Sequence, residues 1–225
     1  VSLITVEYDV REDEPESTEV FRLMSASNDR VAEWIHRIFP HVSQVDRERI
    51  AAFSEGNFRV ARALAETLRK GETLGLLKNS ELFFRIFQQR NAPDKPLQHA
   101  AEDLSLLYSF DGVDTSNAGE LATIARIHGA TASDLFAQVA ELRQRGVVQA
   151  RGKWRAILPQ AIANRLASLA LKRISLADFD VFCAALSPRM LKSLSRRLGY
   201  LHDSQEAQSI VTRWLQPGGR LEHFN

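Results

Sequence analysis

Residues 147–158 have the sequence VVQARGKWRAIL, and this stretch decides the fold of the region around it. Apolar and polar residues alternate on both sides of the pair Gly152-Lys153, which predicts two antiparallel strands joined by a two-residue turn. Just upstream, helical spacing predicts a helix that is capped by Thr131 or Ser133 and runs to Arg145. The stretch is therefore expected to be a β-hairpin that follows a helix directly.

Two more helices are predicted farther upstream, at about 97–109 and 118–128, with a turn at 111–114 between them. Three helices followed by a two-stranded hairpin is the order of elements in a winged helix, in which the third helix and the hairpin present one shared face. Pro159 suits the first turn of a further helix, which we expect to reach about Leu171.

Four regions are expected along the chain. The linker at 91–96 contains Pro93 and Pro96, which disfavour both a helix and a sheet ladder, so a boundary is predicted near residue 93. The winged-helix domain is assigned to 93–171. Extended segments are predicted at 1–10 and 18–23 within region 1–27, a helical bundle over 28–92 and a carboxy-terminal helical segment over 172–225.

The predicted fold class is therefore mainly α: a helical bundle, a short amino-terminal extended segment, a winged-helix domain with one β-hairpin, and a carboxy-terminal helical segment. In the bundle, helices are expected from Asn28 or Asp29 to Pro40, from Asp46 to Gly56-Asn57, from Phe58 to Gly71, and from Leu76 to Gln89. The carboxy-terminal helices are expected near 176–186, 188–198 and 204–215, with Asp203 and Glu206 forming a capping box for the last one.

The composition indicates a globular protein, since 44% of the 225 residues are hydrophobic and 25% are charged. No apolar run approaches the roughly 18 residues of a membrane span, and the amino-terminal segment carries acids where a signal peptide carries a basic, apolar run. A single cysteine, Cys183, excludes an internal disulfide and a thiolate zinc site. We expect a soluble, cytoplasmic protein without membrane contact and a buried, inert Cys183.

No catalytic motif is found in the sequence. It contains no GxxxxGK[ST] loop, no GxGxxG after a strand, no HExxH and no GxSxG. The six histidines are scattered, and none forms an i, i+4 pair suited to a metal ion. We therefore predict no catalytic residue and no metal site.

Charge is distributed unevenly although the formal net charge is only +1. Residues 1–19 hold seven acids against Arg11 alone, and residues 142–198 hold twelve Lys or Arg against Asp178 and Asp180. A local basic excess can attract polyanions, although a solvated basic face is an equal alternative. The candidate nucleic-acid contacts are Arg143, Arg145, Arg151, Lys153 and Arg155, with Arg189, Lys192, Arg196 and Arg197 downstream, and with Gln138 and Gln144 as base readers.

A candidate phosphate site lies in the run SEGNFRVARAL at 54–64. A helix end, the turn Gly56-Asn57 and Arg59 in the next first turn place a guanidinium beside free backbone N–H groups at a helix amino terminus. The planar fork of arginine can bind two oxyanion oxygens at once. An exposed arginine in a first turn is also common, so this arrangement alone leaves the phosphate role open.

The same run resembles the sensor-2 segment of AAA+ ATPases and the lid motif of the STAND class of signalling ATPases. The resemblance implies that Arg59 contacts a terminal phosphate and that Gly56 and Asn57 form the lid turn. Phe58 stands where STAND members usually have proline. Residues 3–10 look like the sensor-1 strand of the ATPase core, which makes 1–27 its remnant, 28–92 the lid and 93–171 the winged helix. Leu158-Pro159-Gln160 replaces the Met-His-Asp of the family, so no contact to the β-phosphate is carried over.

The resemblance implies a fragment of an ATP-binding regulatory switch, whose Walker A and B motifs are expected before Val1. The parent would bind ATP or ADP with Mg²⁺, would pair this segment with its own ATPase core, and can form a homo-oligomer. The fragment alone is expected to bind no nucleotide and to catalyse nothing. The alternatives are a winged-helix DNA-binding module and a helical scaffold, for which ordinary core packing is the competing interpretation. The scaffold would bind protein through Met190, Leu191, Leu194, Leu198 and the segment Tyr200-Leu201-His202.

Overall fold

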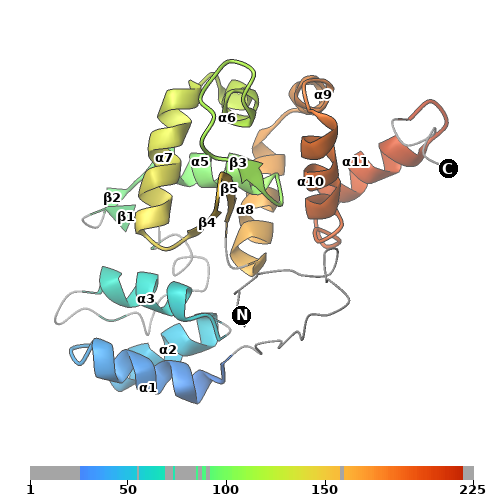
Figure 1. Cartoon of the computed structure of the whole chain (residues 1–225). Coiled ribbons are helices and arrows are strands. Elements are labelled where there is room, and N and C mark those ends of the chain that lie inside the picture. Colours follow the sequence, from blue (N-terminus) through green and yellow to red (C-terminus); the bar gives the residue numbers. More distant parts are fainter. Residues whose placement is uncertain are drawn as a thin grey trace, which may run out of the picture.

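The computed structural model describes residues 26–54, 56–68, 73, 85, 88–89, 92–157 and 160–219. These residues form helices and a small three-stranded antiparallel sheet, so the prediction of a mainly α fold is confirmed (Figure 1). The extended segments predicted at 1–10 and 18–23 lie outside the described residues, and so does most of the helix predicted from Leu76.

Within the described residues, the amino-terminal bundle contains α1 (Asn28–Ile38), α2 (Gln44–Ser54) and α3 (Phe58–Thr67), as predicted apart from their ends. Ser27 rather than Asn28 or Asp29 caps α1, and Ser43 bonds to the backbone N–H of Asp46 at the start of α2. The helices pack on one another through fully buried side chains. These include Val31, Ile35, Ile50 and Leu64, each 0% exposed.

The winged-helix prediction is met by the order of the next elements. These are α5 (Lys95–Ser105), β3 (Phe110–Asp111), α6 (Glu120–Ala125), the 3₁₀ helix η1 (Arg126–His128), α7 (Ala132–Gln144), β4 (Val148–Arg151) and β5 (Trp154–Ile157). The hairpin is confirmed, with Val148 opposite Ile157 and Arg151 opposite Trp154. Gly152 adopts a φ of 54°, which its lack of a Cβ permits.

Strand β3 is a feature that the sequence pattern did not reveal. It pairs with β5, so the sheet has the strand order β3-β5-β4. Only two residues, Phe110 and Asp111, form this strand, which is too short to show alternation in the sequence. The sequence predicts a turn at 111–114, whereas Asp111 belongs to the strand.

The predictions around residues 88–96 are wrong in two places. Gln88-Gln89 form a strand, β1, rather than the end of a helix, and pair with β2 (Ala92–Pro93). The linker prediction also extended too far, since Lys95 and Pro96 already belong to α5. Proline is tolerated in a first helical turn because the N–H groups there have no partner within the helix. Asp94 caps the helix by accepting from Leu97 N at 3.1 Å.

From residue 160 to residue 219 the structure describes the helices α8 (Gln160–Arg173), α9 (Leu176–Ala184), α10 (Pro188–Leu198) and α11 (Gln205–Leu215). The predicted Asp203 capping box is wrong. Ser204 is the cap and accepts from Ala207 N at 3.3 Å, while Asp203 remains exposed. Met190, Leu194 and Leu198 are at most 4% exposed, so in α10 these side chains are core residues rather than a protein-binding surface.

Helix α5 lies at the centre of this second body and packs on α8, α7 and β5. Leu97, Ala101 and Leu104 of α5 and Leu166 and Ala170 of α8 are all 0% exposed. Figure 1 shows α10 and α11 beside this body on the side away from α7. The carboxy-terminal helices therefore extend the winged-helix core.

The cap of α7 provides a test of the local fold. Thr131 Oγ1 accepts from Asp134 N at 3.1 Å, and Asp134 Oδ2 accepts from Thr131 N at 3.2 Å. Thr131→Ala is expected to lower the free energy of unfolding by about 1 kcal/mol, because it removes one side of this box. Ser133→Ala is the matched control and should be neutral, since alanine is the better helix former. Urea denaturation measures both, and equal losses would contradict the assignment of the cap.

Candidate functional site

The turn between α2 and α3 is held by Asn57. Its Oδ1 accepts from Arg59 N at 3.0 Å and from Val60 N at 3.2 Å, and its carbonyl accepts from Ala61 N at 3.1 Å. The prediction that these N–H groups are free for a phosphate is therefore wrong for Arg59 and Val60, because a short polar side chain before a helix caps it in preference to leaving its donors unpaired. Gly56, with a φ of 82°, makes the turn possible.

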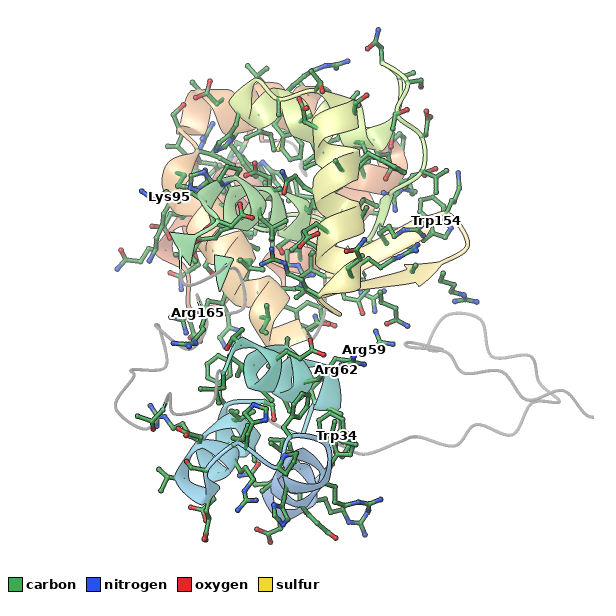
Figure 2. All side chains as sticks on the ribbon, turned by 90° about the vertical axis from the view of Figure 1, so that its left-hand side faces the viewer. Trp34, Arg59, Arg62, Lys95, Trp154 and Arg165 are labelled. Carbon is green, nitrogen blue, oxygen red and sulfur yellow. The ribbon has the colours of Figure 1, made fainter. Side chains whose placement is uncertain are left out.

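The Arg59 side chain is the part of this turn that faces outward. Arg59 is exposed, and within the described residues its guanidinium makes neither a hydrogen bond nor an ion pair. Arg62, one turn later, differs because its Nε lies 2.7 Å from Glu66 Oε1. Figure 2 shows both arginines on the side of α3 that is turned toward the body containing α5–α8. Arg59 thus remains able to meet an anion.

Phe58, the residue that follows Asn57, packs against other aromatic side chains. The Phe58 ring meets Trp34 edge to face at a centroid distance of 5.3 Å, and Trp34 meets Phe39 at 6.1 Å. Phe58 is nevertheless 38% exposed. Its ring therefore anchors the start of α3 on α1 next to Arg59.

The predicted nucleic-acid contacts come from the end of α7 and from the hairpin, and the structure gives several of them internal partners. Lys153 Nζ lies 2.9 Å from Asp111 Oδ2 and 4.6 Å from the centre of the Trp154 ring. Although burial alone would raise the pKa of Asp111, the hydrogen bond from Lys153 and those from two backbone N–H groups lower it. This aspartate is therefore a lasting negative partner for the lysine.

Arg145 and Arg155 are also engaged inside the chain. Arg145 Nε lies 2.7 Å from Glu141 Oε1, and its Nη2 lies 3.8 Å from Asp94 Oδ2. Arg155 Nη1 donates to the carbonyls of Gly152 and Trp154, at 2.7 and 2.9 Å. The arginine stem also covers Gly112, where a Cβ would overlap Arg155 Cγ. The remaining two candidates, Arg143 and Arg151, are exposed.

The outer face of α7 carries little that reads nucleic acid. Phe136 is 42% exposed, and Ala137 and Ala140 are exposed beside it. Gln144 is exposed at the end of the helix, whereas Gln138 is half-buried. Base recognition depends on polar side chains that reach base edges, and in the middle of this helix the exposed side chains Phe136, Ala137 and Ala140 are apolar.

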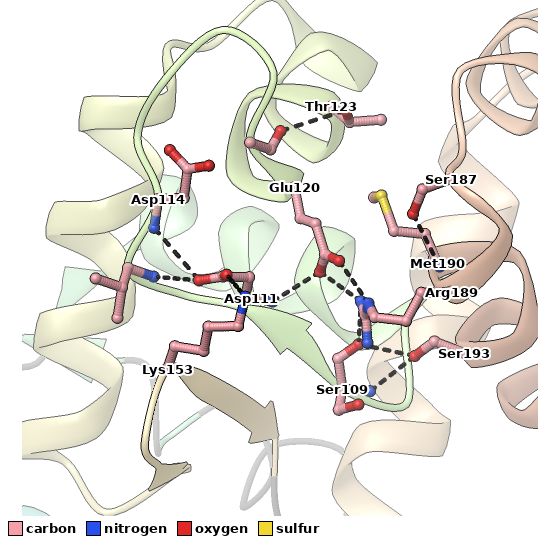
Figure 3. A network of polar contacts seen from close by, with 12 residues as sticks. Ser109, Asp111, Asp114, Glu120, Thr123, Lys153, Ser187, Arg189, Met190 and Ser193 are labelled. Carbon is pink, nitrogen blue, oxygen red and sulfur yellow. Dashed lines mark hydrogen bonds and ion pairs between the residues drawn. The ribbon is translucent and has the colours of Figure 1, made fainter.

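A polar network that the sequence did not reveal attaches α10 to the sheet (Figure 3). The Arg189 guanidinium binds both oxygens of the Glu120 carboxylate and donates to the Ser109 carbonyl at 3.1 Å. Ser193 Oγ donates to the same carbonyl at 2.7 Å. The Arg189 guanidinium also lies 4.7 Å from the centre of the Trp154 ring. Residue 189 was predicted to contact nucleic acid, but here it secures α10.

Arg197 is the most deeply buried cation of the described residues, with 1% of its surface exposed. Its Nε donates to the Ser105 carbonyl at 2.9 Å and its Nη1 to Asn164 Oδ1 at 2.5 Å. Arg196 lies over the Tyr108 ring at 3.9 Å. The basic excess at 142–198 therefore consists in part of cations that hold the fold together.

The described part of the chain was also compared with what a metal site, a membrane span and a ligand cleft require. Its His, Cys, Asp and Glu side chains nowhere gather in a group of three suited to a metal ion. None of its helices combines the length and the apolar character that a membrane crossing needs. An open cleft of about 360 Å³ lies between α8, α9 and α11 and is lined largely by apolar side chains, including Leu171, Ile174 and Phe179.

Comparison of the chain with protein-family models gives no match, and comparisons with curated proteins and with solved structures give none either. The candidate site is therefore defined by its own geometry. Of the residues predicted to bind a nucleotide, the Arg59 side chain fits a phosphate contact, since it is exposed and has no partner within the described residues. Asn57 does not fit one, since its side chain already serves the helix.

The network in Figure 3 gives a second testable prediction. The Glu120 side chain is 15% exposed and receives charge-assisted bonds from Arg189 and a bond of 2.7 Å from Asp111 N. Glu120→Ala is expected to cost about 2–3 kcal/mol of unfolding free energy, because it leaves partly buried donors unpaired.

Glu141→Ala is the matched control. Its carboxylate also binds an arginine, but it is 39% exposed and lies one helical turn from Arg145. Exposed pairs of this kind contribute about 0.5 kcal/mol or less. Urea titration of both variants measures the difference, and a Glu120 variant as stable as the control would show that α10 is not secured by this network.

Proposed function

We propose that the chain supplies the helical lid and the winged helix of a STAND-like, nucleotide-dependent switch, in which Arg59 contacts the terminal phosphate of ATP. The observation that carries the proposal is the exposed Arg59 guanidinium, which has no partner within the described residues and lies on the side of α3 turned toward the second body (Figure 2). A cation in this position is suited to sense a charge that enters between bundle and winged helix.

The order of the two bodies supports the same proposal. The bundle α1–α3 precedes a unit with the element order of a winged helix, as in the family that the SEGNFRVARAL run resembles. In Figures 1 and 2, α3 is the bundle helix nearest to the body that contains α5–α8. A phosphate bound at Arg59 would therefore act on the helix best placed to transmit a displacement.

In this proposal the role of the chain is binding and coupling. Arg59 supplies charge-assisted hydrogen bonds to phosphate oxygens, which are stronger than bonds between neutral groups. The phosphate-binding loop and the ligands of Mg²⁺ come from polypeptide outside residues 1–225, because the sequence holds no such loop. ATP and Mg²⁺ would supply the phosphoryl charge there, and the proposal places the module in the cytoplasm as part of an ATPase that can self-associate.

The first test uses residues 1–225 alone. Because the phosphate loop lies elsewhere in this proposal, titration calorimetry with Mg-ATP up to micromolar concentrations is expected to show no binding, and a phosphate-release assay is expected to show no hydrolysis. Binding or hydrolysis of ATP by residues 1–225 alone would contradict the proposal that the phosphate-binding loop lies in other polypeptide.

The second test uses the complete nucleotide-binding module, formed by these residues and the phosphate-binding polypeptide. Arg59→Ala is expected to weaken ATP binding about 10- to 100-fold, the equivalent of about 1.5–3 kcal/mol for hydrogen bonds to a charged group. Binding of ADP should change less, because it lacks the terminal phosphate.

Arg62→Ala is the matched control, since Arg62 lies one turn farther along the same side of α3 and is bound to Glu66. It is expected to change ATP affinity less than twofold. Equal effects of the two variants would indicate a general loss of positive charge and would contradict a specific phosphate contact at Arg59.

A further inference from the structure

Four ionisable side chains meet where the end of α8 passes between α5 and η1. Arg173, the last residue of α8, places its Nε 2.6 Å from Glu102 Oε2, its Nη2 3.0 Å from Asp103 Oδ1 and its Nη1 2.8 Å from His128 Nε2. One guanidinium thus joins two neighbouring carboxylates of α5 to a histidine of η1. These four residues are called the α5–α8 cluster below.

The carboxylates of the cluster are almost completely removed from water. The Glu102 and Asp103 side chains are 2% and 10% exposed, and that of Arg173 is 26% exposed. Glu102 Oε1 also accepts from Gln98 Nε2 at 2.7 Å. Glu102 Oε2 touches Arg173 Nε as an ion pair, although the geometry is not that of a hydrogen bond. Charge that is left unbalanced here is costly because little solvent screens it.

The histidine is held in its neutral form by the same guanidinium. Arginine only donates hydrogen bonds, so His128 Nε2 accepts from it and the ring proton resides on Nδ1. Nδ1 lies 3.7 Å from Asp103 Oδ2. Burial and the nearby Arg173 charge both lower the pKa of His128. The same two causes lower the pKa of His99, which lies one turn before Asp103 on α5.

Charge counting then shows that the cluster carries one charge in excess. Two carboxylates face one guanidinium and a neutral histidine, so the fully ionised cluster has a net charge of −1. A single proton removes this excess. The pKa of Asp103 is raised to about 7, chiefly by burial; the Arg173 charge opposes the rise and the adjacent Glu102 charge adds to it.

Other charged groups of the described residues lie on α5, on the elements packed against it and on η1. Of the groups on elements packed against α5, Arg145 binds Glu141 and Asp94 at the opposite end of the helix, and Glu120 binds Arg189. Only Arg173 and Glu102 act on Asp103 appreciably. The others are Lys95, Arg126, Asp134, Arg143, Arg155, Arg165 and Lys172, and α9, which packs on η1, adds Asp178 and Asp180.

The position of the cluster gives its protonation a structural consequence. Arg173 ends α8, and α9 begins three residues later and packs against η1. The cluster is thus a polar contact between the first helix of the winged-helix unit and the start of the carboxy-terminal helices.

We propose that the α5–α8 cluster is a proton-operated joint: with one proton bound, it holds the last turn of α8 to α5 and η1, and loss of that proton loosens this attachment. The proposal stands apart from nucleotide binding, since it involves no residue of the lid.

The direction of the effect follows from proton linkage. The carboxyl of Asp103 holds its proton more tightly in the folded chain than in the unfolded one, where the pKa is 3.8. The contribution of this bound proton to the stability of the folded chain is therefore complete below about pH 4, and it is lost as the pH rises toward 7. Within this window the equilibrium between closed and open joint falls by at most about tenfold per pH unit.

Hydrogen exchange of residues 1–225, followed by NMR between pH 5.5 and 7.5, tests the proposal. The Ile174 amide, which donates to the Ala170 carbonyl at 3.1 Å, reports on the last turn of α8. After correction for intrinsic exchange, its protection is expected to fall at least threefold across this range. The Gln208 amide of α11, bound to the Ser204 carbonyl, should show no such change.

Two variants and one direct titration complete the experiment. Asp103→Asn cannot ionise and is expected to abolish the pH dependence at Ile174, whereas Asp203→Asn, at a side chain that is 96% exposed, should retain it. If the first variant does not fold, the ¹³C signal of the Asp103 carboxyl in the unchanged chain decides. A midpoint near 7 supports the joint, and a midpoint below 5, or pH-independent protection, overturns it.

Discussion

The close packing of α5 on α8 is the constraint on which the rest of the structure depends. Both helices present fully buried small and medium side chains to the core, among them Ala101 and Leu104 on α5 and Ala163 and Ala167 on α8. Small residues at a contact allow two helices to approach closely. Helix α7 and strand β5 then pack on α5, so the winged-helix arrangement assembles around one helix pair.

Arginine side chains add polar contacts to this apolar helix pair. Arg197 of α10 donates to a carbonyl near the end of α5, and Arg189 of the same helix binds Glu120 at the start of α6. Arg173 ties α8 to the acidic pair on α5. Part of the basic excess at 142–198 is thus matched by acids and carbonyls from residues 94–120, whereas Arg143, Arg151 and Lys192 are exposed.

Elements with local signals were predictable, and elements that depend on distant residues were not. The hairpin and the cap at Thr131 follow from turn and cap chemistry within a few residues. Strand β3 exists because β5 lies beside it, and a strand of two residues leaves no periodic trace. The same reason explains why the Glu120–Arg189 pair was not foreseen, since a contact across 69 residues has no signature in a single sequence. At the candidate site, the position of Arg59 was predictable from the Gly-Asn turn. The use of Asn57 as a cap required the geometry of the turn itself.

The described residues form two bodies, a bundle that ends in α3 and a winged helix built on α5 and α8, with an exposed arginine between them. If this arrangement serves a nucleotide switch, the bodies must change their relation when the terminal phosphate is present. Spin labels at the exposed positions Ala52 on α2 and Gln144 on α7, introduced as Ala52→Cys and Gln144→Cys with Cys183→Ser, can report that relation in the complete nucleotide-binding module. The account predicts that the distance distribution differs between the ADP and ATP states and that Arg59→Ala removes the difference. The same distribution in both states would contradict it.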